Sequence, residues 1–341
     1  MSRAEFFSFR GSASARTVGE ALPHNNCSQS TAGVSYGKWG RQSLPKGFTL
    51  SVARAHQYLG SYRLLNLVGT GRHCEVWDAM HDALAERRAC KLIVNQYAKD
   101  KEQVALMRQE FAAAKEMHHK HVIRVYEFNV DKEVPFLAME YFPSVNLKQL
   151  ILQGRDALEP RMLKIIERAA IGLGHVHEQG WVHRDIKPDN FLISAEDDVK
   201  LIDFALAEKK KSGLAKFFGR GKVQGTRSYM SPEQIRGQAL DQCADIYSFG
   251  CTIFEALAGR PPFTGVSTDD LLNKHLRNQP PSLEAQNRNV STEFSNLIKR
   301  MLAKEKEERP QSLTEFLRDM MSIRVLKVLP KTVTGKASEP T

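Results

Sequence analysis

Two aspartates, a lysine and an asparagine have the spacing that a phosphoryl-transfer site would need. Asp185, Lys187 and Asn190 lie within the short stretch 183–190, and Asp203 follows the asparagine by thirteen residues. An aspartate can orient an attacking hydroxyl group, a lysine can neutralise charge on the phosphoryl group, and an asparagine with a second carboxylate can hold Mg²⁺. Any one of these residues alone is more simply a loop residue with satisfied polar groups, so the prediction depends on the complete set.

The surrounding sequence predicts the elements that would position these residues. The apolar run 199–202 is typical of a buried strand and leads directly to Asp203. Residues 161–179 carry apolar side chains with a helical period and end at Gly180, a common helix terminator. We therefore expect a strand and a helix to deliver the two aspartates to one site.

A glycine-rich turn and a lysine in a strand are predicted further upstream. Residues 62–68 read as a strand that leads to Gly69 and Gly71. Such a turn lets backbone N–H groups approach phosphate oxygens, although the same two glycines also fit an ordinary hairpin turn. Lys91 lies in the β-rich run 87–94 between apolar neighbours, where its charge needs a partner.

In this order, the motifs resemble those of protein kinases over residues 62–321. Residues 183–190 (His-Arg-Asp-Ile-Lys-Pro-Asp-Asn) are similar to the catalytic loop, and residues 203–205 (Asp-Phe-Ala) to the Asp-Phe-Gly motif. Residues 225–233 are similar to the end of the activation segment. The motifs are most similar to those of the bacterial members of the eukaryotic-type (Hanks-type) serine/threonine protein kinases.

The resemblance implies an α+β fold with two lobes, the protein kinase fold. The N-lobe, residues 62–139, would be a small antiparallel sheet with one helix, joined by a hinge at 140–143 to a larger, mainly helical C-lobe at 144–321. Residues 1–55 are expected to form a disordered basic arm, and residues 322–341 a C-terminal tail.

The resemblance also assigns roles to residues outside the catalytic loop. Lys91 would hold the α- and β-phosphates of ATP, and the family's usual spacing places its ion-pair partner at Glu110, on a helix expected over 103–117. Asn190 and Asp203 would bind Mg²⁺, with Mn²⁺ as an alternative ion. The other residues expected around ATP are Val68, Gly69, Gly71, Val76, Ala89, Met139, Glu140, Phe142 and Leu192. Structural roles are expected for Glu233, Asp245 and Arg309.

Two positions depart from the family pattern. Cys74 stands where the third glycine of the phosphate-binding loop is usual, and Ala205 replaces the glycine of Asp-Phe-Gly. Alanine narrows the backbone angles available after Phe204. We hypothesise that it hampers the inward–outward movement of Phe204 more than it harms catalysis. An Ala205→Gly variant with unchanged kcat and inhibitor profile would contradict this hypothesis.

The expected activation segment is unusual in its charge. Arg184, in the family, usually accepts a phosphate group carried by this segment. Ser212 is nevertheless the only hydroxyl residue between Ala205 and Thr226, and basic residues such as those at 209–211 fill much of the segment. Three explanations stay open: phosphorylation of Ser212, a segment that is ordered without phosphate, or an acidic partner that docks there.

Length and composition limit the remaining possibilities. A chain of 341 residues suits two lobes with tails, and five cysteines without Cys-x-x-Cys spacing argue against a disulfide framework. The net charge of +10 comes largely from the activation segment and from residues 1–55, which hold seven Lys or Arg against two acidic residues. We interpret these residues as a solvated tail; an arm that binds acidic partners and an organelle transit peptide are less favoured alternatives.

The absence of an eighteen-residue apolar run predicts no membrane span. We expect a cytoplasmic protein with protein substrates and no nucleic-acid partner, and the oligomeric state stays open.

The resemblance implies a serine/threonine protein kinase that transfers the γ-phosphoryl group of Mg·ATP to proteins and to itself. Asp185 would orient the acceptor hydroxyl, Lys187 would stabilise the γ-phosphoryl group, and Thr226 would shape the site for serine and threonine. The main alternative is a pseudokinase scaffold that binds nucleotide or partners without turnover; Cys74 and Ala205 keep it open, and the intact set of site residues weighs against it. A small-molecule kinase is disfavoured by the segment 225–233.

Overall fold

The computed structural model describes residues 58–210 and 225–328. The predicted arm 1–55, Ser212 and residues 329–341 of the predicted tail lie outside the described residues.

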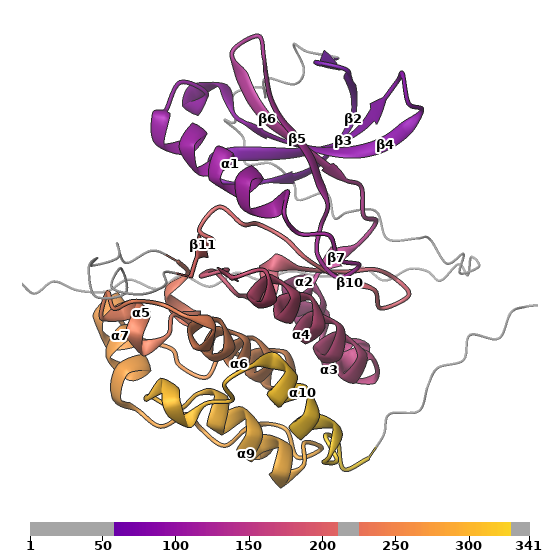
Figure 1. Ribbon diagram of the computed structural model, residues 1–341. Coiled ribbons are helices and arrows are strands. Elements are labelled where there is room, and N and C mark those ends of the chain that lie inside the picture. Colours follow the sequence, from indigo (N-terminus) through magenta and orange to yellow (C-terminus); the bar gives the residue numbers. More distant parts are fainter. Residues whose placement is uncertain (1–57, 211–224, 329–341) are drawn as a thin grey trace, which may run out of the picture. The chain divides into compact units, whose positions relative to one another are not determined.

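The first part of the described chain is an antiparallel sheet with one long helix beside it (Figure 1). Six strands follow the order β1-β2-β3-β4-β6-β5, and each neighbouring pair is antiparallel. Helix α1 packs against β5 and β6. The strands are β1 (Tyr58–Leu59), β2 (Tyr62–Thr70), β3 (Cys74–His81), β4 (Glu86–Ile93), β5 (Val125–Asp131) and β6 (Val134–Glu140). A 3₁₀ turn, η2 (Asn95–Tyr97), precedes α1 (Lys101–Ala114).

Helix α1 is shifted relative to its prediction over 103–117. Asp100 caps its first turn, because the side-chain oxygen accepts a hydrogen bond from the backbone N–H of Glu102 at 2.9 Å. At the other end, Glu116 and Met117 donate to carbonyls only three residues back, which closes the helix as a turn. The predicted partner of Lys91, Glu110, is on the buried face of this helix.

The second part of the described chain is mainly helical (Figure 1). Helix α6 is buried along almost its whole length and contacts α2, α4, α5, α8 and α9. The α-helices are α2 (Leu147–Gln153), α3 (Arg155–Leu158), α4 (Met162–Glu178), α5 (Pro232–Ile235), α6 (Gln242–Ala258), α7 (Thr268–Arg277), α8 (Leu283–Gln286), α9 (Thr292–Met301) and α10 (Leu313–Met321). The 3₁₀ turns are η3 (Glu159–Arg161), η4 (Pro188–Asn190), η6 (Arg227–Tyr229) and η7 (Lys306–Glu308). This arrangement agrees with the predicted α+β fold.

Short strands carry the loops that matter most for the expected chemistry. Strands β7 (Val145–Asn146), β9 (Phe191–Ile193) and β10 (Val199–Leu201) form one small antiparallel sheet, and β8 (Trp181–Val182) pairs with β11 (Glu208–Lys209). The predicted helix over 161–179 is α4, and the predicted strand over 199–202 is β10. Asn190 directly precedes β9 and Asp203 follows β10, so the antiparallel pairing brings both to the same end of this sheet.

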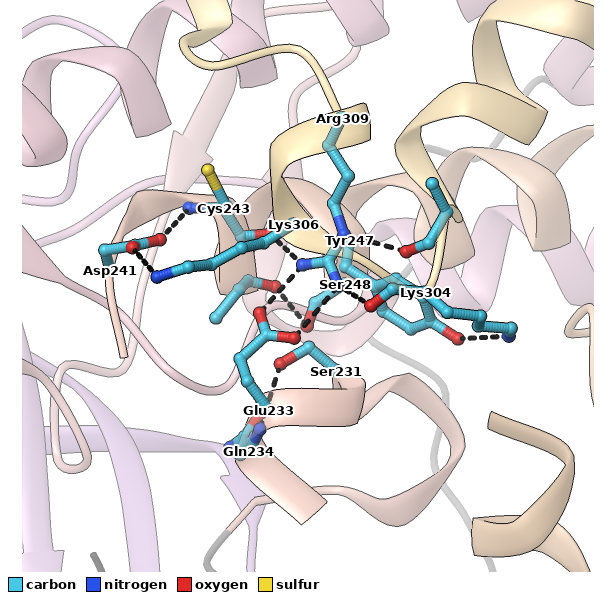
Figure 2. A network of polar contacts seen from close by, with 12 residues as sticks. Ser231, Glu233, Gln234, Asp241, Cys243, Tyr247, Ser248, Lys304, Lys306 and Arg309 are labelled. Atoms are coloured by element: carbon cyan, nitrogen blue, oxygen red, sulfur yellow. Dashed lines mark hydrogen bonds and ion pairs between the residues drawn. The ribbon is translucent and has the colours of Figure 1, made fainter. Parts of the chain in front are cut away.

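A buried ion pair fastens the end of the activation segment to the helical part, as Figure 2 shows. The guanidinium of Arg309 makes two parallel hydrogen bonds to the carboxylate of Glu233, at 2.7 and 2.9 Å. It also donates to the backbone carbonyls of Ala303, Cys243 and Lys304. All its donor nitrogens are thus used, which is what a charge buried in a protein requires.

None of the helices in the two described ranges has the length and apolar character that a membrane crossing needs. The four cysteines in the described part of the chain all carry free thiols.

The variant Arg309→Met is expected to lower the free energy of unfolding by about 3–5 kcal/mol, because Glu233 would stay buried without its partner. Denaturation followed by circular dichroism measures the loss. The matched control is Arg318→Met, which breaks an ion pair to Asp319 whose arginine is 74 % exposed and should cost about 1 kcal/mol or less. Equal losses in the two variants would contradict the structural role of Arg309.

Candidate functional site

Two predicted site residues from distant parts of the chain, Glu110 and Asp203, meet at Lys91. This residue lies in β4, opposite Val76 of β3 and Leu137 of β6. Its ammonium nitrogen is 2.7 and 2.9 Å from the two carboxylate oxygens of Glu110 and 3.2 Å from Oδ1 of Asp203. The ion pair between Lys91 and Glu110 that the sequence predicts is therefore present, and Asp203 joins it.

The charges of this cluster stabilise one another. Burial alone would lower the pKa of Lys91, but the carboxylates of Asp203 and Glu110 outweigh burial and raise the pKa above its ordinary value. In turn, the ammonium of Lys91 lowers the pKa of Asp203, against the effect of burial. Burial raises the pKa of Glu110 to about 6 even though Lys91 opposes the shift. At neutral pH the cluster thus contains one cation between two carboxylates.

The catalytic-loop residues form a second, hydrogen-bonded group. Lys187 Nζ donates to Oδ2 of Asp185 at 2.6 Å and to the hydroxyl of Thr226 at 3.0 Å. The backbone N–H and the hydroxyl of Thr226 both donate to Oδ1 of Asp185, each at 3.0 Å. Asn190 reaches the backbone carbonyl of Asp185 with its amide nitrogen at 2.7 Å. The carboxylate of Asp185 is therefore held at both oxygens.

Asp245 holds the backbone of the catalytic loop, in agreement with the structural role expected for it. It lies in α6 and is 1 % exposed, and its carboxylate accepts from the backbone N–H of His183 at 2.7 Å and of Arg184 at 2.8 Å. His177 in α4 lies 2.9 Å from the same carboxylate. Arg184 has a φ of 70°, in the left-handed region that a residue with a side chain rarely adopts. These contacts fix a backbone conformation that would otherwise be disfavoured.

The segment 203–205 accepts alanine without strain. Asp203 has a φ of 70°, whereas Ala205 is absent from the positive-φ residues of the described chain. Phe204 is buried, and its ring centroid lies 5.0 Å from that of His183. Glycine is therefore not required at position 205 in this conformation. The hypothesis about the movement of Phe204 stays a prediction.

Asn190 and Asp203 suit a magnesium ion that is shared with phosphate groups. The described ranges contain no group of three or more His, Cys, Asp or Glu side chains that could hold a metal ion by themselves. Magnesium is commonly bound by one or two protein oxygens together with phosphate oxygens and water. Asn190 uses its amide nitrogen for the bond to Asp185, so its amide oxygen is the atom that would face a cation. The donor set therefore fits Mg²⁺ and fits Mn²⁺ equally well.

The expected phosphate-binding loop is the tight hairpin between β2 and β3. Gly69 is in β2 opposite Val76, and the backbone N–H of Gly71 donates to the carbonyl of Cys74 at 2.7 Å. Burial raises the pKa of the half-buried Cys74 thiol, which is therefore protonated at neutral pH. This geometry fits a phosphate-binding turn and an ordinary hairpin turn alike. The contact of Gly69 and Gly71 with phosphate therefore stays a prediction.

Most of the predicted adenine-binding residues lie on neighbouring strands of the six-stranded sheet, whereas Phe142 follows β6 and Leu192 is in β9. Ala89 of β4 pairs with Met139 of β6, and Glu140, at the predicted hinge, forms an ion pair with Lys200 of β10 at 2.9 Å. Roles at the base stay predictions for Val68 of β2, Val76 of β3, Ala89, Met139, Glu140, Phe142 and Leu192 of β9.

Two functional contacts were missed from the sequence. Arg184 pairs with Glu208 in β11, and His177 contacts Asp245. Glu208 is the only acidic residue between Ala205 and Thr226, which is a signal that could have singled it out. The helical period could have singled out His177, because it follows Leu173 by four residues and so lies on the apolar face of the helix, whereas His175 lies on the opposite face.

Comparison with known proteins gives one family and several curated relatives. The chain matches the model of the family described as protein kinase domain over residues 62–321. Serine/threonine-protein kinase PknB of Mycobacterium tuberculosis is 31% identical over 266 residues, which cover 77% of this chain and 42% of the relative. Serine/threonine-protein kinase PrkC of Bacillus subtilis is 31% identical over 261 residues, covering 76% of this chain and 40% of the relative. The chain thus spans about two fifths of the length of these relatives.

The variant Glu110→Gln is expected to lower kcat/KM for the predicted phosphoryl transfer about tenfold or more, because Lys91 would lose its nearest carboxylate. The wild type should lose the same interaction as the pH falls through about 6, where Glu110 takes up a proton. The measurement is kcat/KM as a function of pH for both proteins. In the wild type kcat/KM should fall as Glu110 is protonated, and this fall should be missing from the variant. Glu102→Gln, at an exposed position of α1, is the matched control. Equal activity of the two variants would contradict the role of Glu110.

Proposed function

Because the chain belongs to the protein kinase family, we propose that it transfers the γ-phosphoryl group of ATP to serine and threonine hydroxyl groups of proteins, including its own. The observation that carries this proposal is the hydrogen-bonded group of Asp185, Lys187 and Thr226. It places a fixed carboxylate beside an ammonium group, which is what an acceptor hydroxyl and a transferring phosphoryl group need. Protein substrates are proposed on the same basis, and their identity stays open.

In this reaction some residues would position the reacting groups and others would neutralise their charge. Asp185 accepts a hydrogen bond from the acceptor hydroxyl and directs its oxygen at the γ-phosphorus. Lys187 faces the oxygens of the phosphoryl group, and Lys91, fixed by Glu110, holds the α- and β-phosphates. As the new phosphorus–oxygen bond forms, the bond to the β-phosphate oxygen breaks, ADP leaves, and the hydroxyl proton passes to Asp185 or to water.

Asn190 and Asp203 are the residues that would hold Mg²⁺, with Mn²⁺ as an alternative. When bound, the ion offsets negative charge on the β- and γ-phosphates. Strands β9 and β10 position these two residues and pair with each other. Backbone hydrogen bonds between the strands therefore set the distance between Asn190 and Asp203. Fixed charges of this kind supply most of the catalytic effect in phosphoryl transfer.

Serine and threonine are the proposed acceptors for two reasons. Thr226 donates to Asp185 and accepts from Lys187, so it closes the site around the catalytic aspartate. The relatives described above are named serine/threonine-protein kinases. Ala205 and Cys74 kept open the alternative of a scaffold without turnover, but alanine is accommodated without strain and Cys74 lies in an intact hairpin.

The variant Asp185→Asn is expected to lower the rate of phosphoryl transfer about 10³-fold, because the acceptor hydroxyl would lose its orienting carboxylate. Transfer of labelled γ-phosphate from Mg·ATP, to the chain itself and to a generic basic protein, measures the rate. Asp189→Asn, at an exposed position of the same loop, is the matched control and should stay close to the wild type.

Transfer to serine or threonine by the wild type, abolished in Asp185→Asn, supports the proposal. If the wild type binds ATP and carries every activating modification but transfers no phosphate, the scaffold is favoured instead.

A further inference from the structure

The arginine that precedes the catalytic aspartate is bound to a carboxylate of its own chain. The side chain of Arg184 is 11 % exposed, and its guanidinium donates to Glu208 in β11. The backbone of Arg184 is fixed as well, because its N–H donates to Asp245 and its carbonyl accepts from the side chain of Gln234 at 3.0 Å. With the ion pair to Glu208, both the backbone and the side chain of Arg184 are held.

Backbone pairing brings Glu208 to this position. β11 pairs with β8 in antiparallel register, with Glu208 opposite Val182 and Lys209 opposite Trp181. Val182 lies two residues before Arg184, so Glu208 and Arg184 are diagonal neighbours across the pair, within reach of long side chains. The N–H of Lys210 extends the pairing by donating to the carbonyl of Gly180 at 2.8 Å.

The same short strand is also bound to the region of α1. Gln109 in α1 donates from its side chain to the carbonyl of Ala207 at 2.7 Å. Just past the helix, Glu116 accepts from Lys209 at 3.1 Å and from the indole N–H of Trp181 at 3.1 Å. Gln109 is adjacent to Glu110, the partner of Lys91. The start of the activation segment therefore contacts both the helix that positions Lys91 and the loop that carries the catalytic aspartate.

We propose that Glu208 is a positioning residue that takes the place of an activating phosphate group, so that the site is ordered without phosphorylation of residues 211–224. The inference rests on the kinase activity proposed above. A phosphate group orders such a segment by offering an anion to an arginine. A carboxylate offers two acceptor oxygens to the same guanidinium, and in this chain it is already paired.

A phosphate group on Ser212 would have to compete with Glu208 for Arg184. The phosphate group would carry a charge of about −2, whereas the Arg184 guanidinium is already neutralised by the Glu208 carboxylate. Of the three explanations for the basic activation segment, the Arg184–Glu208 pair thus favours the one that needs no phosphate group.

The test compares phosphate-free proteins. Wild type, Ser212→Ala, Glu208→Gln and Glu208→Asp are treated with a phosphatase, and mass spectrometry verifies the absence of phosphate. The phosphate-free wild type and Ser212→Ala should keep their activity within about twofold of the untreated wild type. Glu208→Gln should lose about tenfold in kcat, equivalent to about 1.4 kcal/mol, with KM for ATP little changed. Glu208→Asp, which keeps the charge, should recover part of the loss.

Two controls separate this role from a merely structural one. Glu284→Gln removes a carboxylate that forms a similar ion pair, with Lys327 at 2.7 Å, and should leave kcat unchanged. In a double-mutant cycle, Arg184→Gln with Glu208→Gln should lose no more activity than the worse single variant, because both changes break the same pair.

The outcomes distinguish this inference from the proposed function. A wild type that transfers phosphate only after phosphorylation, or a phosphate-free Glu208→Gln with wild-type kcat, overturns the role of Glu208 and leaves the kinase activity intact. A wild type that transfers none in either state, although it binds ATP, overturns both. If Glu208→Gln does not fold, the comparison of treated and untreated wild type still decides whether phosphate is needed.

Discussion

A buried ammonium group between two carboxylates is the constraint on which the rest of the site depends. Lys91 lies in the sheet, Glu110 on α1, and Asp203 just past β10, and the Lys91 nitrogen lies 2.7 to 3.2 Å from the carboxylate oxygens of the other two. A charge removed from water in this way costs several kcal/mol unless it is paired. Since no single element supplies both carboxylates, the sheet, the helix and the small β9–β10 pair must come together before Lys91 is satisfied.

The catalytic loop follows a different rule, in which backbone strain is balanced by hydrogen bonds from a rigid element. Arg184 and Asp203, at either end of the site, both have positive φ. Asp245 in the buried helix α6 binds two successive backbone N–H groups of the loop and so supports the strained residue. The interior helix, which touches no reacting group, thereby sets the geometry around Asp185.

The sequence predicted the contacts that depend on spacing and left out those that depend on packing. The Lys91–Glu110 pair and the position of Thr226 beside Asp185 follow from motif order, because each motif fixes where its residue lies in the fold. The ends of α1 were misplaced by two or three residues, because apolar periodicity registers neither the capping aspartate at its start nor the tight turn that closes its end. The pair between Arg184 and Glu208 requires the register of β8 and β11, two-residue strands that carry no periodic signal. Ser212 lies outside the described residues, so its phosphorylation stays an open alternative.

The pairing of β11 with β8 limits how the chain can change in length during evolution. Side chains alternate between the two faces of a strand, so a shift of one residue turns every side chain to the opposite face. Four residues separate Asp203 from the start of β11, and both ends of this stretch are fixed, one by Lys91 and the other by Val182. An insertion or deletion of one residue there would direct the carboxylate away from Arg184 and put an alanine or a lysine in its place. A change in the length of this stretch is therefore more disruptive to the pair than a substitution that keeps its length.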